Sequence, residues 1–147
     1  MKVTMNVKKL HEKAILPTYG SEWAAGADLY ACEEGEVTLA AGETRLIHTG
    51  LALEIPEGLV GLVYARSGLA SKRGLAPANK VGVIDCDYRG EVMVALHNHS
   101  TVPQSIAPGE RIAQIVFTPY YAAEFTEVGE LSDTVRGSGG FGSTGTK

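Results

Sequence analysis

The chain has 147 residues, a comfortable size for one domain with a hydrophobic core of its own. Hydrophobic residues make up 44% of the sequence and charged residues 20%, which are the ordinary proportions of a soluble globular protein. The net charge of -4 leaves no basic footprint and excludes long nucleic acid as an expected partner, although a few arginines can still form a local anion site.

The N-terminal stretch MKVTMNVKKLHEK lacks the apolar segment of a signal peptide, and no apolar run reaches the length of a membrane span. We therefore expect a cytoplasmic protein that does not contact a membrane. Cys32 and Cys86 are widely spaced, and each lies in an apparent apolar strand. In this setting we expect two buried free thiols rather than a disulfide.

Hydrophobic side chains recur mostly at every second residue, which is the period of a β-strand with one buried face. The strand candidates with this pattern are 2–7, 36–39, 44–55, 59–66, 79–85, 91–98 and 111–119. Turns that contain Gly or Pro separate them, and one short helix is expected over 67–75, stopped by Gly74. The pattern predicts an all-β domain, a sandwich or barrel.

Polar residues interrupt the apolar pattern, first at Asp28 in AAGADLYA and then in ARSGLASK, residues 65–72. Ser67 and Gly68 open the predicted helix, where backbone amides suit a phosphate, and Arg66 adds positive charge beside them. The alternative is structural, because a serine before a helix is commonly its N-cap. The adjacent arginine favours an anion site.

The densest polar group is GVIDCDYRGEV, residues 82–92. On a strand, the carboxylates of Asp85 and Asp87 share one face. Two interpretations stay open from the spacing alone. The aspartates cap the turn before Gly90, or one of them is a general base while Tyr88 packs on a sugar or a base.

Two further candidates follow toward the C-terminus. His97 and His99 lie two residues apart, but no third ligand with metal-like spacing accompanies them, so a structural zinc site is not expected. Gln114 stands among apolar residues of the 109–117 segment, and a buried glutamine needs a backbone or ligand partner. Together the arginines, amides and carboxylates indicate a polyanionic ligand.

The composition changes at residue 136, where RGSGGFGSTG begins. We expect a β-rich domain over 1–135 and an extended Gly-rich arm over 136–147. Such a composition is typical of disorder, because it buries too little apolar surface to offset the lost entropy. The aromatic Phe141 at its centre favours a lid that becomes ordered over a ligand instead.

Five segments taken together resemble the motifs of the trimeric dUTP nucleotidohydrolases, the dUTPases. They are AGADLYA, ARSGLASK, GVIDCDYRGEV, GERIAQIVF and RGSGGFGSTG, in family order, and they span residues 25–145. The resemblance implies a distorted jelly-roll-like subunit and a homotrimer with active sites shared between subunits. It also implies hydrolysis of dUTP to dUMP and pyrophosphate with Mg²⁺, which limits uracil in DNA and supplies dUMP for thymidylate synthesis.

The resemblance also implies roles for individual residues. Asp85 resembles the general base that orients and deprotonates the water attacking the α-phosphorus, and Asp28 resembles the outer-shell partner of magnesium-bound water. Tyr88 resembles the residue under the deoxyribose, where a 2′-hydroxyl would clash. The phosphate cradle corresponds to Arg66, Ser67, Gly68 and Gln114, and the uracil pocket to Asn79, Gly82 and Met93. In the arm, Phe141 resembles the aromatic that stacks on uracil, and the clamp on the nucleotide corresponds to Arg136, Gly142, Ser143 and Thr144.

Two alternatives remain beside this interpretation. A dCTP deaminase has the same fold and uses a catalytic glutamate after the sugar-binding turn, for which Glu91 is the only candidate. A non-catalytic β trimer that binds a nucleotide or a protein is the other alternative. The intact Asp85 and the intact arm argue against lost catalysis.

Overall fold

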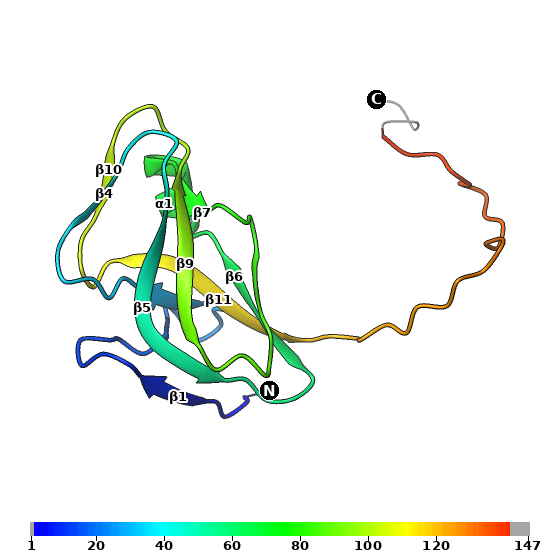
Figure 1. Ribbon diagram of the computed structural model, residues 1–147, viewed down its shortest axis with the longest axis horizontal. Coiled ribbons are helices and arrows are strands. Elements are labelled where there is room, and N and C mark those ends of the chain that lie inside the picture. The colour runs from blue at the N-terminus through cyan, green and yellow to red at the C-terminus, as the bar shows by residue number, and fades with distance from the viewer. Residues whose placement is uncertain (1, 142–147) are drawn as a thin grey trace.

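The computed structural model describes residues 2–141. Its strands are β1 (Asn6–Lys9), β2 (Thr18–Tyr19), β3 (Ala27–Tyr30), β4 (Val37–Leu39), β5 (Thr44–Glu54), β6 (Leu59–Tyr64), β7 (Leu75–Pro77), β8 (Gly82–Ile84), β9 (Glu91–Asn98), β10 (Gln104–Ile106) and β11 (Arg111–Pro119). One sheet has the order β1-β5-β9-β7, a second has the order β2-β3-β11-β6-β8, and β10 pairs with β4. All pairs are antiparallel. The predicted all-β, jelly-roll-like class is therefore confirmed (Figure 1).

The core lies between the two larger sheets, and β9 illustrates why these residues form strands. Its side chains alternate strictly between half-buried and buried, with Val92, Val94 and Leu96 pointing inward. Ile112 and Ile115 of β11 are fully buried in the same cluster from the opposite sheet. A period of two is what places one face of each strand against a common core.

The single helix found in the described residues is α1 (Ser67–Arg73), which follows β6 and is anchored by the buried Leu69. It ends at Gly74, which has a φ of 67° and whose N–H donates to the Ala70 carbonyl, as the predicted stop requires. The suggested N-cap role for Ser67 is wrong. Arg66 is still extended and occupies the cap position, so Ser67 is already the first helical residue. No helix in the described part of the chain is long and apolar enough to cross a membrane.

The structure corrects several details of the sequence prediction. The first strand begins at Asn6, so only the end of the expected 2–7 segment is paired. The short strands β2, β7 and β10 were not predicted, because two or three residues are too few to display a period. Cys32 and Cys86 are free thiols as expected, but they lie just after β3 and β8 and are only half-buried.

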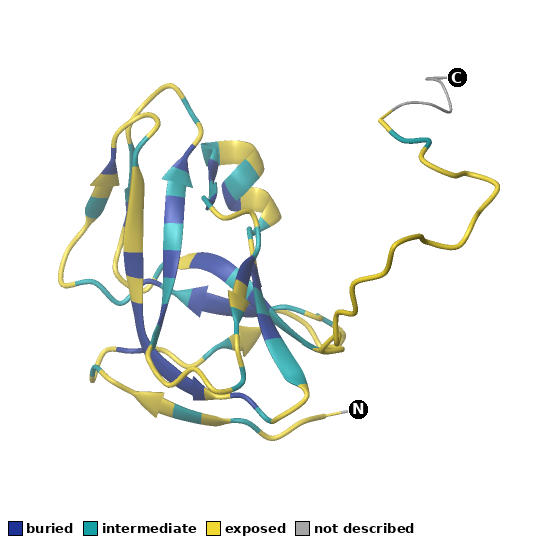
Figure 2. Ribbon diagram, turned by 45° about the vertical axis from the view of Figure 1, so that its right-hand side comes forward, coloured by how far each residue is buried: buried dark blue, intermediate teal, exposed yellow. Residues whose placement is uncertain are grey.

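Residues 120–141, the described part of the chain after β11, contain no helix or strand and run away from the body (Figure 1). Figure 2 shows that this segment is exposed along nearly its whole length. Its exposed side chains include the large apolar residues Tyr121, Phe125, Leu131, Val135 and Phe141. Exposed apolar side chains gathered on one segment are typical of an interaction surface.

A buried polar side chain, Asn98, ties the end of β9 to its surroundings. Its Nδ2 donates to the carbonyls of Leu39 and Val102, at 3.1 and 2.8 Å. Its Oδ1 accepts hydrogen bonds from the backbone N–H and the hydroxyl of Ser100, at 2.9 and 2.7 Å. Asn98 therefore joins β9 to β4 and to the loop before β10.

Replacing Asn98 with Ala should lower the free energy of unfolding by about 1–3 kcal/mol, because the buried Leu39 carbonyl loses its donor. Urea denaturation followed by circular dichroism measures the change. Asn6→Ala is the matched control, since Asn6 contacts Glu54 on the exposed surface, and its effect should stay within about 0.5 kcal/mol. Equal effects of the two substitutions would contradict this role of Asn98.

Candidate functional site

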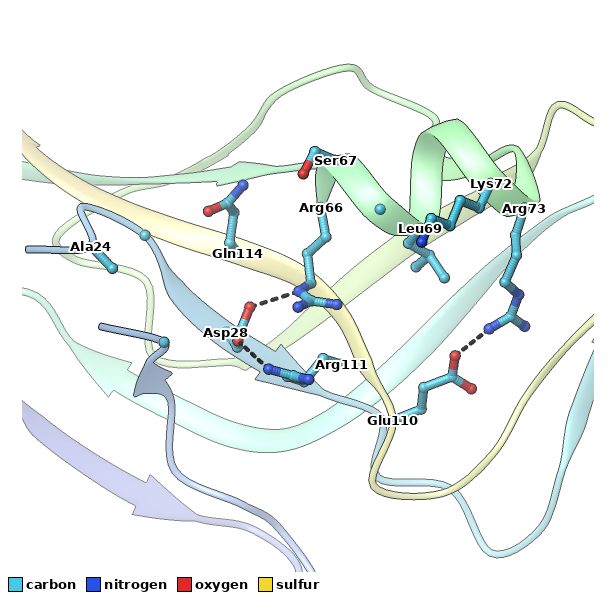
Figure 3. Close-up of a pocket in the computed structure, with 13 residues that line it drawn as sticks. Ala24, Asp28, Arg66, Ser67, Leu69, Lys72, Arg73, Glu110, Arg111 and Gln114 are labelled. Atoms are coloured by element: carbon cyan, nitrogen blue, oxygen red, sulfur yellow. Dashed lines mark hydrogen bonds and ion pairs between the residues drawn. The ribbon is translucent and has the colours of Figure 1, made fainter. Parts of the chain in front are cut away.

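A cleft of about 570 Å³ opens between α1, β3 and β11 (Figure 3). Its lining contains five of the residues that the sequence singled out, namely Asp28, Arg66, Ser67, Gly68 and Gln114. They come from three separate segments of the chain, which the β3–β11 and β11–β6 pairings bring side by side. The volume is in the range of small-molecule sites.

Asp28 lies between two arginines on the wall of this cleft (Figure 3). Its Oδ1 accepts a hydrogen bond from Arg66 Nε at 2.7 Å, and its Oδ2 lies 3.4 Å from an Arg111 guanidinium nitrogen. The carboxylate is nearly buried, whereas both guanidinium groups are partly exposed. One negative charge thus holds two positive groups in place without cancelling both of them.

The charge of the cleft as a whole suits a polyanion. Its lining includes four cationic side chains and two carboxylates. One of the cations is already occupied, because Arg73 pairs with Glu110 and donates to the Ser105 carbonyl. Lys72, which is exposed, and the two arginines beside Asp28 provide the remaining positive charge.

Gln114 is oriented by the backbone. Its Nε2 donates to the Ala65 carbonyl at 2.9 Å, so the side chain both ties down the chain before α1 and borders the cleft. Gly26 lies against it, and a Cβ at that position would collide with Gln114 Oε1. Gly26 is thus a requirement of the site that sequence reasoning missed.

Arg111 was also missed, and the reason is a β-bulge. On a regular strand, residues three apart such as Arg111 and Gln114 point to opposite faces. The register of β11 on β3 shifts between Arg111 and Ala113, which brings both side chains to the same cleft. An irregularity of this kind leaves no signal in the spacing of the sequence.

A second cavity of about 210 Å³ lies beside the turn after β8. Its lining contains Leu46, Val83, Ile84, Asp85, Tyr88, Glu91 and Met93. A smaller hollow of about 70 Å³ shares Met93 with it and includes Asn79 and Gly82. The residues that the resemblance assigns to the base, the sugar and the attacking water are therefore neighbours. None of them lines the first cleft.

The expectation that Asp85 and Asp87 share a strand face is wrong, because β8 ends at Ile84. The two aspartates lie in a turn instead, closed by the Tyr88 N–H donating to the Asp85 carbonyl at 3.2 Å. Asp85 borders the second cavity, and Asp87 does not. Of the two carboxylates in this turn, only that of Asp85 is therefore placed to act at the cavity.

The arm residues lie apart from both cavities. Arg136 Nε donates to the Gly139 carbonyl at 2.8 Å, and Phe141 is fully exposed. Neither residue lines the cleft or the second cavity. Gly142, Ser143 and Thr144 lie outside the described residues.

Metal-binding groups are sparse in residues 2–141, where no group of three or more His, Cys, Asp or Glu side chains is arranged to hold an ion. His97 and His99 pack ring edge against ring face, with their centroids 4.3 Å apart. The two carboxylates of the cleft, Asp28 and Glu110, are too few to form a cage of protein ligands, which fits Mg²⁺ that is carried mainly by phosphate oxygens and water. Glu110 is already paired with Arg73.

Comparison with known proteins places these features in a family. The sequence model of the dUTPase family matches residues 12–145. The deoxyuridine 5'-triphosphate nucleotidohydrolase of Syntrophotalea carbinolica is 48% identical over 143 residues, covering 97% of both chains. The structure of Staphylococcus bacteriophage 80alpha dUTPase with dUpNHpp has a TM-score of 0.90 and 32% identity, covering 99% of this chain and 100% of that one. A mutant dUTPase of S. aureus phage phi11, described with a structural Mg(II) ion, has a TM-score of 0.81 and 28% identity, covering 89% of this chain and 100% of that one.

One titratable pair beside the second cavity links stability to pH. His48 Nδ1 lies 2.9 Å from Glu91 Oε2, and the backbone N–H of His48 donates to Glu33 at 2.9 Å. The hydrogen bond to Glu91, with smaller contributions from the charges of Glu91 and Glu33, raises the pKa of His48 above its usual value. A raised histidine pKa stabilises the fold in full below about pH 6.5, and this stabilisation is lost as pH rises through the raised value.

The stability difference between the protein and His48→Gln should therefore be largest below about pH 6.5 and should shrink toward pH 8. Melting temperatures recorded across this range measure it, and the effect is expected to be small because His48 is half exposed. His99→Gln is the control. Its stability difference should change with pH in the opposite direction, since burial and the neighbouring His97 lower the pKa of His99. Parallel pH curves for the protein and His48→Gln would contradict this linkage.

Proposed function

Because the chain belongs to the dUTPase family, we propose that the cleft, the second cavity and the arm are three parts of one dUTP site. Hydrolysis of dUTP to dUMP and pyrophosphate is the activity of the chain. Family membership thus decides between this activity and the deamination of dCTP. The observation that supports the proposal is that the cationic cleft and the cavity with Asp85 and Tyr88 share no lining residue. Each part therefore holds only some of the groups that the reaction needs.

In this proposal the cleft takes the triphosphate. Arg66 and Arg111 face it from the Asp28 ion pair, and Lys72 adds a third cation. Ser67 and Gly68 contribute backbone and hydroxyl donors at the start of α1, and Gln114 borders the same space. Donors that are already held in place cost little reorganisation when charge develops on the phosphates.

Mg²⁺ is the proposed cofactor, with Asp28 as its outer-shell partner through a bound water. When bound, the ion neutralises charge on the phosphate oxygens. A cleft with four cationic side chains and only two carboxylates fits this role better than it fits a cage made of protein ligands.

Asp85 is the proposed general base. It takes a proton from a water that attacks the α-phosphorus in line, so that a new P–O bond forms while the bond to the pyrophosphate leaving group breaks. Asp85 is exposed on the turn after β8 and borders the cavity, a position suited to holding a water molecule. Its main contribution is the placement of that water, because an aspartate carboxylate is a weak base.

The second cavity and the adjoining hollow are the proposed nucleoside site. Asn79, Gly82 and Met93 surround the uracil, and Tyr88 lies under the deoxyribose. A 2′-hydroxyl would clash with the tyrosine ring. A clash of this kind discriminates more sharply than the loss of one apolar contact.

A homotrimer would join the parts, with the cleft, the nucleoside cavity and the arm coming from different subunits. The exposed apolar side chains along 120–135 support such docking on a neighbouring copy. Phe141 would then stack on the uracil, while Arg136, Gly142, Ser143 and Thr144 clamp the nucleotide. In this scheme the domain is 1–135, the arm is 136–147, and the enzyme is cytoplasmic.

Asp85→Asn should keep nucleotide binding and lower kcat by about 10²–10⁴-fold, because the substituted side chain cannot accept the proton of water. Release of dUMP and pyrophosphate from dUTP measures turnover, and calorimetry with dUpNHpp measures binding. Asp87→Asn changes the same charge on the same turn and should leave kcat nearly unchanged. Normal turnover by Asp85→Asn would refute its role as the base.

Shared sites can be tested by mixing two inactive chains. A chain truncated after residue 135 keeps Asp85, while an Asp85→Asn chain keeps the arm. Each alone should be inactive, and the two refolded together should regain part of the activity, because some sites then combine an intact Asp85 with an intact arm. Sedimentation gives the oligomeric state. An inactive mixture that is fully assembled would mean that each arm serves its own subunit.

A further inference from the structure

We propose that Glu91 is a positioning residue that fixes Tyr88 for sugar recognition. Its contacts with Tyr88, His48 and Gly50 join the start of β9 to β5, and we call this set of contacts the clasp. This inference rests on the proposed function, in which Tyr88 lies under the deoxyribose. Glu91 does not need to touch the substrate in order to act, because its main chain and its side chain hold different parts of the cavity wall.

The main chain of Glu91 determines where the phenol of Tyr88 points. The Tyr88 hydroxyl donates to the Glu91 carbonyl at 2.9 Å. To reach it, the ring folds back over Gly90, where a Cβ would lie 2.5 Å from the hydroxyl oxygen. The orientation of the ring thus depends on a glycine and on the position of one carbonyl group.

The side chain of Glu91 holds that carbonyl in place. Its Oε1 accepts the backbone N–H of Gly50 at 2.8 Å, and its Oε2 contacts His48 Nδ1 at 2.9 Å. His48 and Gly50 lie where the register between β5 and β9 shifts, and Gly50 has a φ of 67°. Without the carboxylate, the Gly50 N–H and the imidazole would both lose a partner at an irregular point of the sheet.

The clasp also suits the charge of the cavity. Glu91 and Asp85 line the same space, and two carboxylates there would repel an incoming nucleotide. His48 faces Glu91 and offsets part of its charge when the imidazole is protonated, and it makes no such contact with Asp85. The two acids of the cavity thereby have separate tasks.

The test compares Glu91→Ala with Glu43→Ala. Glu43 is a matched control, because it also accepts a backbone N–H, that of Ala40 at 2.7 Å, and pairs with a cation, Arg45 at 3.4 Å, at the opposite end of β5. Glu91→Ala should raise KM for dUTP about tenfold and change kcat less than KM. It should also lower the ratio of kcat/KM for dUTP to kcat/KM for UTP. Glu43→Ala should leave all three values unchanged at a temperature well below melting.

A double-mutant cycle separates positioning from general stability. Tyr88→Phe keeps the ring but removes its bond to the Glu91 carbonyl. If Glu91 acts through Tyr88, the double variant should raise KM, relative to the unchanged protein, by clearly less than the product of the two single effects. If Glu91→Ala fails to fold, Glu91→Gln takes its place in the cycle, because the glutamine side chain keeps an acceptor for the Gly50 N–H. Glu91→Gln should raise KM by about two- to threefold, since only the charge of the side chain is lost.

The outcomes distinguish this inference from the function beneath it. Unchanged KM and selectivity in Glu91→Ala, or effects that multiply fully with Tyr88→Phe, would overturn the positioning role while leaving the site intact. Tyr88→Ala probes the underlying placement of the sugar. Normal selectivity against UTP in Tyr88→Ala would overturn that placement and this inference together.

Discussion

The carboxylate of Asp28, shared between Arg66 and Arg111, is the interaction on which the cleft depends. It joins the strand β3, the junction between β6 and α1, and the strand β11 at one point. Two guanidinium groups close together repel each other, and a nearly buried carboxylate between them offsets that repulsion. The arginines are therefore held at the cleft, and in the proposed site a triphosphate would meet donors that are already in place.

The rigidity of the sandwich explains why one chain presents its chemistry in separate parts. The cleft is built on β3 and β11, while Asp85 and Tyr88 follow β8 at a different part of the surface. Strands packed on one close-packed core do not slide to bring such groups together. In the proposed homotrimer, a complete site would therefore combine groups from neighbouring copies, and oligomerisation would be a catalytic requirement.

The sequence predicted the regular parts of the molecule well, for physical reasons that individual residues illustrate. Val92, Val94 and Leu96 alternate inward with a period of two, and Gly74 ends the helix in the left-handed conformation expected of glycine. The irregular parts were missed. The bulge that turns Arg111 toward the cleft, and the three-residue strands such as β7, arise from tertiary pairing and have no local pattern.

The same limit applied to the site. Five of the cleft residues were predicted from features that are visible in the sequence alone. Asp28 and Gln114 interrupt apolar segments with polar side chains, and Arg66, Ser67 and Gly68 stand at the start of the expected helix. Gly26 was not predicted, since its importance is the missing Cβ that would meet Gln114. Asn98 was also missed, because an asparagine at the end of a strand is usually a surface residue, and its burial and its four hydrogen bonds appear only in the structure.

In the proposed trimer, assembly and substrate binding would each offset part of the entropy that is lost when residues 120–147 become ordered. Ordering a chain segment costs roughly 1–2 kcal/mol per residue in backbone entropy, more than one nucleotide can offset for a segment as long as 120–147. Burying Tyr121, Phe125, Leu131 and Val135 on a partner would return about 1.5–3 kcal/mol for each side chain. In the proposed trimer, assembly thus orders residues 120–135, which precede the arm. The nucleotide then has to order only the glycine-rich end, whose closure excludes water from the site.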